Sequence, residues 1–127
     1  RGIAGNTNAA VAMATGEFIA FADHDDTLAP FALFEVLSAI NADPAVDFLY
    51  SDEDKLDSAG ERVEPNFKPD WSPETIRSRN YVCHLTVMKR SLVEAVGAFR
   101  PGFDGAQDYD LVLRASERAA KIAHLPH

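Results

Sequence analysis

The chain has 127 residues with 20 acidic and 12 basic side chains, which give a formal net charge of −8. This length suits one domain with a single core, and a content of 46% hydrophobic and 25% charged residues is typical of a globular protein. The acidic balance and the lack of clustered Lys and Arg speak against nucleic acid as a partner, because phosphate neutralisation needs such clusters.

The number of cysteines and the hydropathy of the sequence narrow the class of protein further. The single cysteine, Cys83, excludes an intrachain disulfide and indicates a reducing compartment, and no Cys/His spacing of a zinc site occurs. No apolar run approaches the roughly 20 residues that span a bilayer, and the first residues do not resemble a signal peptide. We therefore expect a cytoplasmic protein.

The first half of the sequence predicts a helix, a strand, a helix and a strand. Small and apolar residues over 6–14 predict a helix capped by Asn6 or Thr7, and residues 17–22 form an apolar run typical of a buried strand. Apolar residues recur at helical spacing from Pro30 to Asn41, and residues 46–50 form a second apolar run. A helix between two such strands is typical of a βαβ unit with parallel strands.

The second half alternates between irregular and regular patterns. Residues 51–73 lack a sustained period and carry three of the seven prolines, which predicts a long loop that is functional or disordered, partly packed down by aromatic side chains. Residues 81–90 alternate as a strand does. Residues 91–97 predict a short helix, residues 108–120 a longer one, and residues 121–126 a final strand.

Three carboxylates follow the first predicted strand. In an open α/β sheet, ligands bind beyond the carboxyl ends of the strands, where Asp23, Asp25 and Asp26 are expected. Carboxylates packed this closely repel one another, and a hard divalent cation such as Mg²⁺ or Mn²⁺ relieves the repulsion. The alternative is a solvated loop in which Asp26 or Thr27 caps the next helix.

Two segments together carry a family resemblance. The stretches "NTNAAVAMATGEFIAFADHDDTLAP" and "GAFRPGFDGAQDYDLVLR" resemble the inverting family 2 glycosyltransferases of the GT-A fold, in particular bacterial enzymes that build cell-surface polysaccharides. In that family an Asn-bearing helix precedes a "GE(F/Y)I" strand, the strand ends in a DxD motif, and a later "(E/Q)D" pair opens a helix. The order and spacing of these motifs are matched across nearly the whole chain.

The resemblance implies both a fold and a reaction. The fold would be α/β, with a mixed, mostly parallel sheet and flanking helices. The reaction would be metal-dependent transfer of a sugar from a UDP-, dTDP- or GDP-sugar to a hydroxyl of a saccharide or lipid-linked acceptor, with inversion, in polysaccharide biosynthesis. The full-length enzyme would work in the cytoplasm, at the inner face of the plasma membrane.

Site residues follow from the matched motifs. The resemblance puts the DxD motif on Asp23 and Asp25, with Asp25 as the principal ligand of Mg²⁺ or Mn²⁺ and Asp23 near the metal or the donor ribose. It puts the catalytic base on Asp108, for which capping of the following helix is the structural alternative. Gln107 stands where Glu is commoner, so its contact with the acceptor would be neutral.

The "SDED" stretch and one tryptophan are weaker candidates for substrate binding. Asp52 and Asp54 would line the site near the donor sugar or the acceptor, or else belong to a solvated loop. Trp71 would stack on an acceptor sugar, or else anchor its loop to the core.

Other polar side chains are expected to be structural. His84 is expected to be a satisfied core or edge histidine rather than a ligand. Arg114 either faces the diphosphate or pairs with Asp110 four residues earlier.

The family's first βαβ segment has no counterpart in this sequence. We therefore expect residues 1–127 to form one partial GT-A domain, whose exposed sheet edge predicts self-association. One alternative function is a noncatalytic or inactive fragment that keeps the fold and only binds a partner. A nucleotidyltransferase is disfavoured, because no glycine-rich loop bearing Arg or Lys is present to hold a triphosphate.

Overall fold

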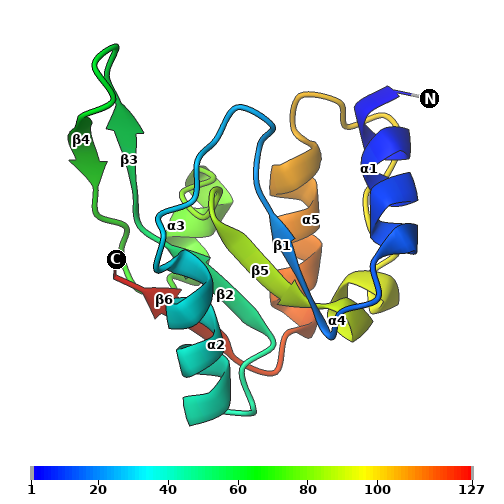
Figure 1. Ribbon diagram of the computed structural model, residues 1–127. Coiled ribbons are helices and arrows are strands. Elements are labelled where there is room, and N and C mark those ends of the chain that lie inside the picture. Colours follow the sequence, from blue (N-terminus) through cyan, green and yellow to red (C-terminus); the bar gives the residue numbers. More distant parts are fainter. Residues whose placement is uncertain (1, 127) are drawn as a thin grey trace.

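The computed structural model describes residues 2–126 and shows a four-stranded sheet with helices on both faces and a separate two-stranded hairpin (Figure 1). In chain order the elements are α1 (Gly2–Met13), β1 (Phe18–Phe21), α2 (Ala32–Ala42), β2 (Phe48–Ser51), β3 (Glu53–Leu56), β4 (Arg62–Asn66), α3 (Pro73–Ser78), β5 (Thr86–Lys89), α4 (Arg90–Ala95), α5 (Gln107–Arg118) and β6 (Ile122–Leu125). The strand order in the larger sheet is β1-β5-β2-β6. None of the helices within residues 2–126 has the length and apolar character needed to cross a bilayer.

The sheet is mixed, and three of its four strands point the same way. Strand β5 runs antiparallel to both β1 and β2, whereas β2 runs parallel to β6. This confirms the mixed, mostly parallel sheet. The predicted βαβ unit is correct in strand direction, but β5 lies between β1 and β2, so these two strands are not neighbours.

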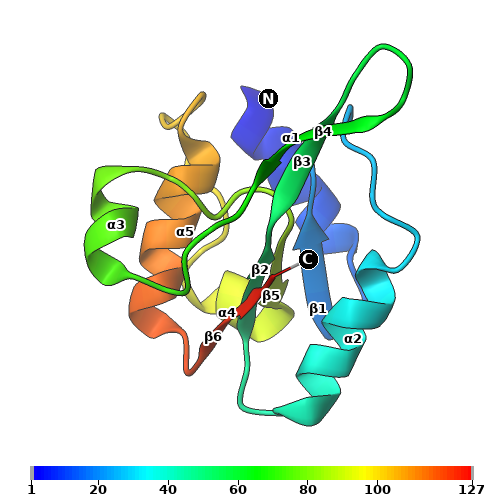
Figure 2. The ribbon, with the colours of Figure 1, turned by 90° about the vertical axis from the view of Figure 1, so that its left-hand side faces the viewer.

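The central strands are buried on both faces, which explains their unbroken apolar sequence. Phe48, Tyr50 and Met88 pack into one core cluster with buried residues of α5. Leu49 and Val87, which alternate with them, pack into a second cluster with a buried residue of α2. Figure 2 shows α5 and α2 on opposite sides of the sheet.

The prediction of a patternless loop over residues 51–73 is wrong. This segment contains the antiparallel hairpin β3–β4, which projects from the sheet, and ends at the first residue of helix α3 (Figure 1). Most hairpin side chains are exposed, and ion pairs cross between the strands, namely Lys55 with Glu64 and Arg62 with Asp54. Because both faces of the hairpin are polar, the sequence carries no apolar alternation to reveal it.

The strand predicted over residues 81–90 is shorter than expected. Only Thr86–Lys89 pair in the sheet. Before that point, the carbonyls of Val82 and His84 accept hydrogen bonds from the Lys68 ammonium at 3.1 and 3.0 Å. The Lys68 side chain therefore satisfies backbone carbonyls that a neighbouring strand would otherwise satisfy.

Helix α1 begins at Gly2 rather than at the predicted cap. Asn6 and Thr7 lie inside the helix, and the Thr7 hydroxyl donates to the carbonyl of Ile3. Asn8 joins α1 to the chain before α5, because its amide donates to the carbonyl of Phe99 at 2.7 Å and its side-chain oxygen accepts from the Phe99 amide at 2.9 Å.

Candidate catalytic and metal site

Three segments distant in sequence meet at one end of the sheet. Strand pairing aligns Phe21 with Thr86. Asp23 lies two residues beyond that pair on one strand, and His84 lies two residues before it on the other. The first turn of α5 brings Asp108 to the same place. We call Asp23, His84 and Asp108 the acid–histidine cluster.

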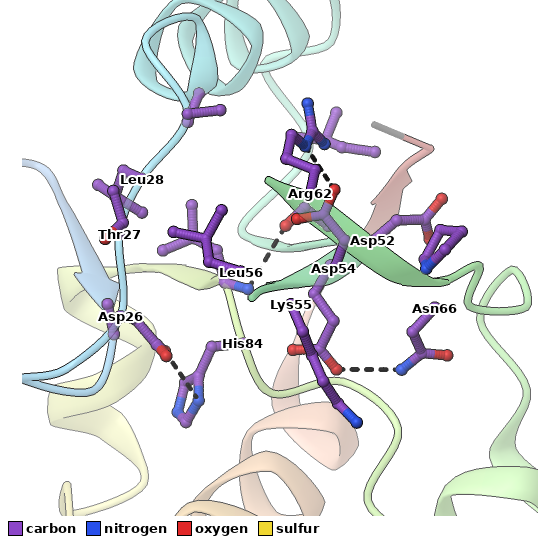
Figure 3. A pocket seen from close by; sticks show the side chains of 18 of the residues that line it. Asp26, Thr27, Leu28, Asp52, Asp54, Lys55, Leu56, Arg62, Asn66 and His84 are labelled. Atoms are coloured by element: carbon purple, nitrogen blue, oxygen red, sulfur yellow. Dashed lines mark hydrogen bonds and ion pairs between the residues drawn. The ribbon is translucent and has the colours of Figure 1, made fainter. Parts of the chain in front are cut away.

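The imidazole of His84 lies between the carboxylates. Its Nδ1 is 3.7 Å from Oδ2 of Asp23 and 4.0 Å from Oδ2 of Asp26, and its Nε2 is 3.9 Å from Oδ2 of Asp108. Figure 3 shows the contact between Asp26 and His84 at the edge of a pocket. The His84 side chain is 15% exposed, whereas Asp23 is 61% and Asp108 31% exposed, so water screens the Asp23 contact more than the Asp108 contact.

The cluster has the donor atoms of a divalent-cation site. One ligand atom from each of its three residues lies within 4.8 Å of the others. The two carboxylates suit Mg²⁺ and Mn²⁺ alike, whereas an imidazole is a commoner ligand of ions such as Zn²⁺. His84 is expected to be a structural histidine, and strand alternation carries no sign of the carboxylates that lie beside it at the strand end.

The other two carboxylates of the acidic stretch have different surroundings. Asp25 is exposed and lines the pocket next to the acid–histidine cluster. Asp26 accepts a hydrogen bond from the Asp23 amide at 3.3 Å. The alternative in which Asp26 or Thr27 caps α2 is not seen, since the N-cap position is Phe31 and no side chain caps this helix.

Asp108 lies in the first turn of α5 without capping it. The N-cap position is Ala106, which makes no side-chain cap bond. Burial raises the pKa of the Asp108 carboxyl, His84 lowers it, and the negative charge of Asp23 raises it. Gln107 is turned to the preceding loop, where its Oε1 accepts from the Gly105 amide at 2.7 Å.

Asp52 and Asp54 are held within the protein. Oδ1 of Asp52 is 2.8 Å from the amide nitrogen of Lys68 and 2.7 Å from Nε2 of His124, and the Asp52 side chain is buried. Asp54 forms an ion pair with Arg62 across the hairpin. Both acids line the pocket next to the cluster, but neither belongs to the cluster itself.

Trp71 lies away from the acid–histidine cluster. Its ring packs against Phe48 and Tyr81, with centroid distances of 6.2 and 6.4 Å. It borders a small pocket shared with α3 and the C-terminal half of α5, whereas Asp108 is at the N-terminal end of that helix. This packing supports the anchoring alternative for Trp71.

An open pocket of about 860 Å³ extends from the cluster. The loop before α2 forms one wall, with Asp26, Thr27 and Leu28, and the β3–β4 hairpin forms the other (Figure 3). His84 lies at the base between the two walls. A ligand in this pocket would reach the acid–histidine cluster.

Sequence reasoning missed the part played by Lys68 and anticipated that of Asp110. The Lys68 side chain is 1% exposed, and its ammonium supports the backbone that carries His84. Nothing in the spacing of residues 51–73 distinguishes this lysine from a solvated one.

Asp110 pairs with Arg114 at 2.7 Å, as one of the two predicted alternatives has it, and also with Arg100.

Comparisons with known proteins identify the family of the chain. Residues 1–97 match the family model for glycosyl transferase family 2. The O-antigen biosynthesis protein RfbC of Myxococcus xanthus is 49% identical over 119 residues, which are 94% of this chain and 9% of that protein. The chondroitin synthase of Pasteurella multocida is 28% identical over 125 residues, which are 98% of this chain and 13% of that protein.

A solved structure shares the fold. The crystal structure of S. aureus TarS 1–349 superposes with a TM-score of 0.72 at 22% identity, and the match covers 98% of this chain and 37% of that chain. Against the two curated relatives above, the chain spans between 9% and 13% of their length.

Proposed function

Because the chain belongs to glycosyl transferase family 2, we propose that it holds the catalytic centre for metal-dependent transfer of a sugar from a nucleotide-diphosphate sugar to an acceptor hydroxyl, with inversion, in polysaccharide biosynthesis. One observation carries this proposal: Asp23, His84 and Asp108 come together from three segments at one end of the sheet. Residues 1–127 would then form one partial GT-A domain. The donor would be a UDP-, dTDP- or GDP-sugar, and the acceptor a saccharide or lipid-linked saccharide in the cytoplasm.

Asp108 is the proposed general base. Its carboxylate would take the proton of the acceptor hydroxyl as that oxygen attacks the anomeric carbon on the face opposite the diphosphate. Partial burial raises its pKa, which makes the carboxylate a stronger base than one in water. Because the Gly105 amide occupies Oε1 of Gln107, a neutral contact of Gln107 with the acceptor would come from its NH₂ group.

Asp23 and Asp25 are the proposed carboxylate ligands of Mg²⁺ or Mn²⁺, with His84 beside them. The cation would neutralise charge on the leaving diphosphate. Asp23 is supported by its place in the acid–histidine cluster, and Asp25 by its exposure on the pocket side of the same loop. Asp108 lies within reach of the same cation, but it would act as the base and not as a ligand, because a carboxylate bound to a metal is a weaker base.

Asp52 and Asp54 are proposed to bind the substrate as part of the pocket wall on the hairpin side. Their bonds to His124 and Arg62 would fix the wall in place. The packing of Trp71 against Phe48 favours its anchoring role over direct contact with a sugar.

Titration of the chain with UDP-, dTDP- and GDP-sugars, with and without Mn²⁺, tests the proposal. Sugar-nucleotide binding that requires Mn²⁺ supports the transferase. Preference for a nucleoside triphosphate would instead favour a nucleotidyltransferase, and absence of binding would favour a noncatalytic fragment.

A further inference from the structure

We propose that the pocket between residues 25–31 and the β3–β4 hairpin binds an uncharged oligosaccharide as the acceptor and excludes anionic polysaccharides. We call this pocket the hairpin groove. The inference rests on the proposed function, since it names the class of acceptor that the acid–histidine cluster would serve.

The hairpin groove begins at the proposed reaction centre. Asp25, Asp26 and His84 line its inner end, and the groove continues between the two walls seen in Figure 3. Its volume of about 860 Å³ lies within the usual range of pockets that hold whole small ligands, roughly 300–1,000 Å³. Asp23 and Asp108 do not line the groove but both lie next to His84, so an acceptor along the groove would have one end beside the acid–histidine cluster.

Apolar side chains are exposed along both walls. Leu28 and Phe31 come from the loop before α2, and Leu56 and Phe67 from the hairpin and its exit. The Phe67 side chain is 78% exposed. Exposed apolar surface inside a groove marks a binding site, and aromatic rings suit the apolar faces of pyranose sugars.

Polar groups between these side chains match sugar hydroxyls. The Asn66 amide donates to Oε1 of Glu53 at 3.0 Å on the hairpin wall. Carboxylate and amide oxygens accept hydrogen bonds and the amide NH₂ donates them, so together they satisfy hydroxyls, which both donate and accept. The groove therefore offers hydrogen bonds and apolar contact together.

The charge of the hairpin groove argues against an anion. Asp and Glu outnumber Lys and Arg by seven to two among its lining residues. The two cations are Lys55 and Arg62, and each already forms an ion pair, with Glu64 and Asp54 respectively. Seven carboxylates against two cations leave an excess of five, so the lining stays negative even with a divalent cation at Asp25, which opposes the binding of an anionic chain.

Binding of the chain to matched hexasaccharides tests the inference. The probes are a panel of uncharged hexasaccharides built from hexoses, deoxyhexoses and N-acetylhexosamines, and hexasaccharides of hyaluronan and chondroitin. We expect an uncharged member to bind most tightly, and Phe67→Ala to raise its Kd about tenfold, the effect of losing one aromatic contact. Phe34→Ala is the matched control, because Phe34 is 69% exposed but lies outside the groove, and its Kd should not change.

Three outcomes would overturn the inference: tightest binding to an anionic probe, no binding of any uncharged probe at millimolar concentration, or equal weakening by the two Phe→Ala variants. Measuring Mn²⁺-dependent sugar-nucleotide binding on the same samples separates the two proposals. If donor binding persists while the oligosaccharide results fail, only the acceptor class is wrong. If donor binding also fails, the proposed function itself is wrong.

Discussion

The ammonium of Lys68 lies beneath the backbone of His84 and donates to its carbonyl at 3.0 Å. The same ammonium donates to the carbonyl of Val82, and the Lys68 amide donates to Asp52. Lys68 thus joins the exit of the hairpin to the segment that brings His84 to the acid–histidine cluster. The buried Lys68 side chain therefore supports both the hairpin groove and the proposed metal site.

Replacing Lys68 with Met should weaken the proposed metal site although Lys68 is not a ligand. The variant leaves two buried carbonyls without their donor, which costs about 2 kcal/mol of folding free energy and frees the His84 segment to move. We expect about a tenfold loss of Mn²⁺ affinity, measured by electron paramagnetic resonance titration. Lys55→Met is the control, because Lys55 is exposed and lies on the hairpin. Equal Mn²⁺ affinity of the Lys68→Met variant and the native chain would contradict this support.

Replacing Asp108 with Asn should remove the proposed base while keeping the side-chain shape. We expect turnover of the enzyme to fall by roughly 10²-fold or more, the scale of general-base removal, with donor affinity nearly unchanged. Steady-state kinetics and donor titration measure the two effects separately. Asp104→Asn, in the exposed loop before α5, serves as the control. Unchanged turnover in the Asp108→Asn variant would exclude the assigned role.

Comparison of Asp25→Ala with His84→Ala should identify the metal ligands. If Asp23 and Asp25 hold the cation, Asp25→Ala weakens Mn²⁺-dependent donor binding more than His84→Ala does. Calorimetric titration with Mn²⁺, followed by sugar nucleotide, gives both affinities. The reverse order would remove Asp25 from the site and assign the cation to the acid–histidine cluster alone.

The ion pairs of Asp110 with Arg100 and Arg114 should make the free energy of unfolding depend on pH in the acid range. Arg100 and then Arg114 lower the pKa of the Asp110 carboxyl. A carboxyl with a lowered folded-state pKa stabilises the fold above its unfolded value of about 3.9 and loses that contribution as pH falls through the folded value. Asp110→Asn should therefore cost about 2 kcal/mol at pH 7 and much less near pH 2, as measured by urea denaturation. A cost that is the same at both pH values would exclude this linkage.

The β1 edge should mediate self-association. Among the strands described in residues 2–126, β1 pairs with β5 alone, so in this chain by itself its other side is an edge that a second chain can pair with. We expect sedimentation velocity to show a concentration-dependent dimer, and Ala20→Lys to shift it to monomer, because Ala20 is exposed and a charged edge opposes pairing. A clean monomer of the native chain at high concentration would reject the prediction.

Elements with an apolar period could be predicted from the sequence. The runs around Phe18 and Phe48 became strands, and Asp23 and Asp108 came within reach of one another as the family motifs imply. The hairpin escaped prediction because its strands are polar on both faces. His84 and Lys68 escaped it because their roles depend on contacts between distant segments, which leave no local period.

The position of β5 orders the steps by which the sheet can assemble. β2 lies early in the chain, yet its two partners within residues 2–126, β5 and β6, both come later. On the ribosome, the apolar strand β2 therefore waits for these partners until roughly two-thirds of these residues have emerged. A nascent chain halted before Thr86 would expose Phe48 and Leu49 to chaperones or to aggregation.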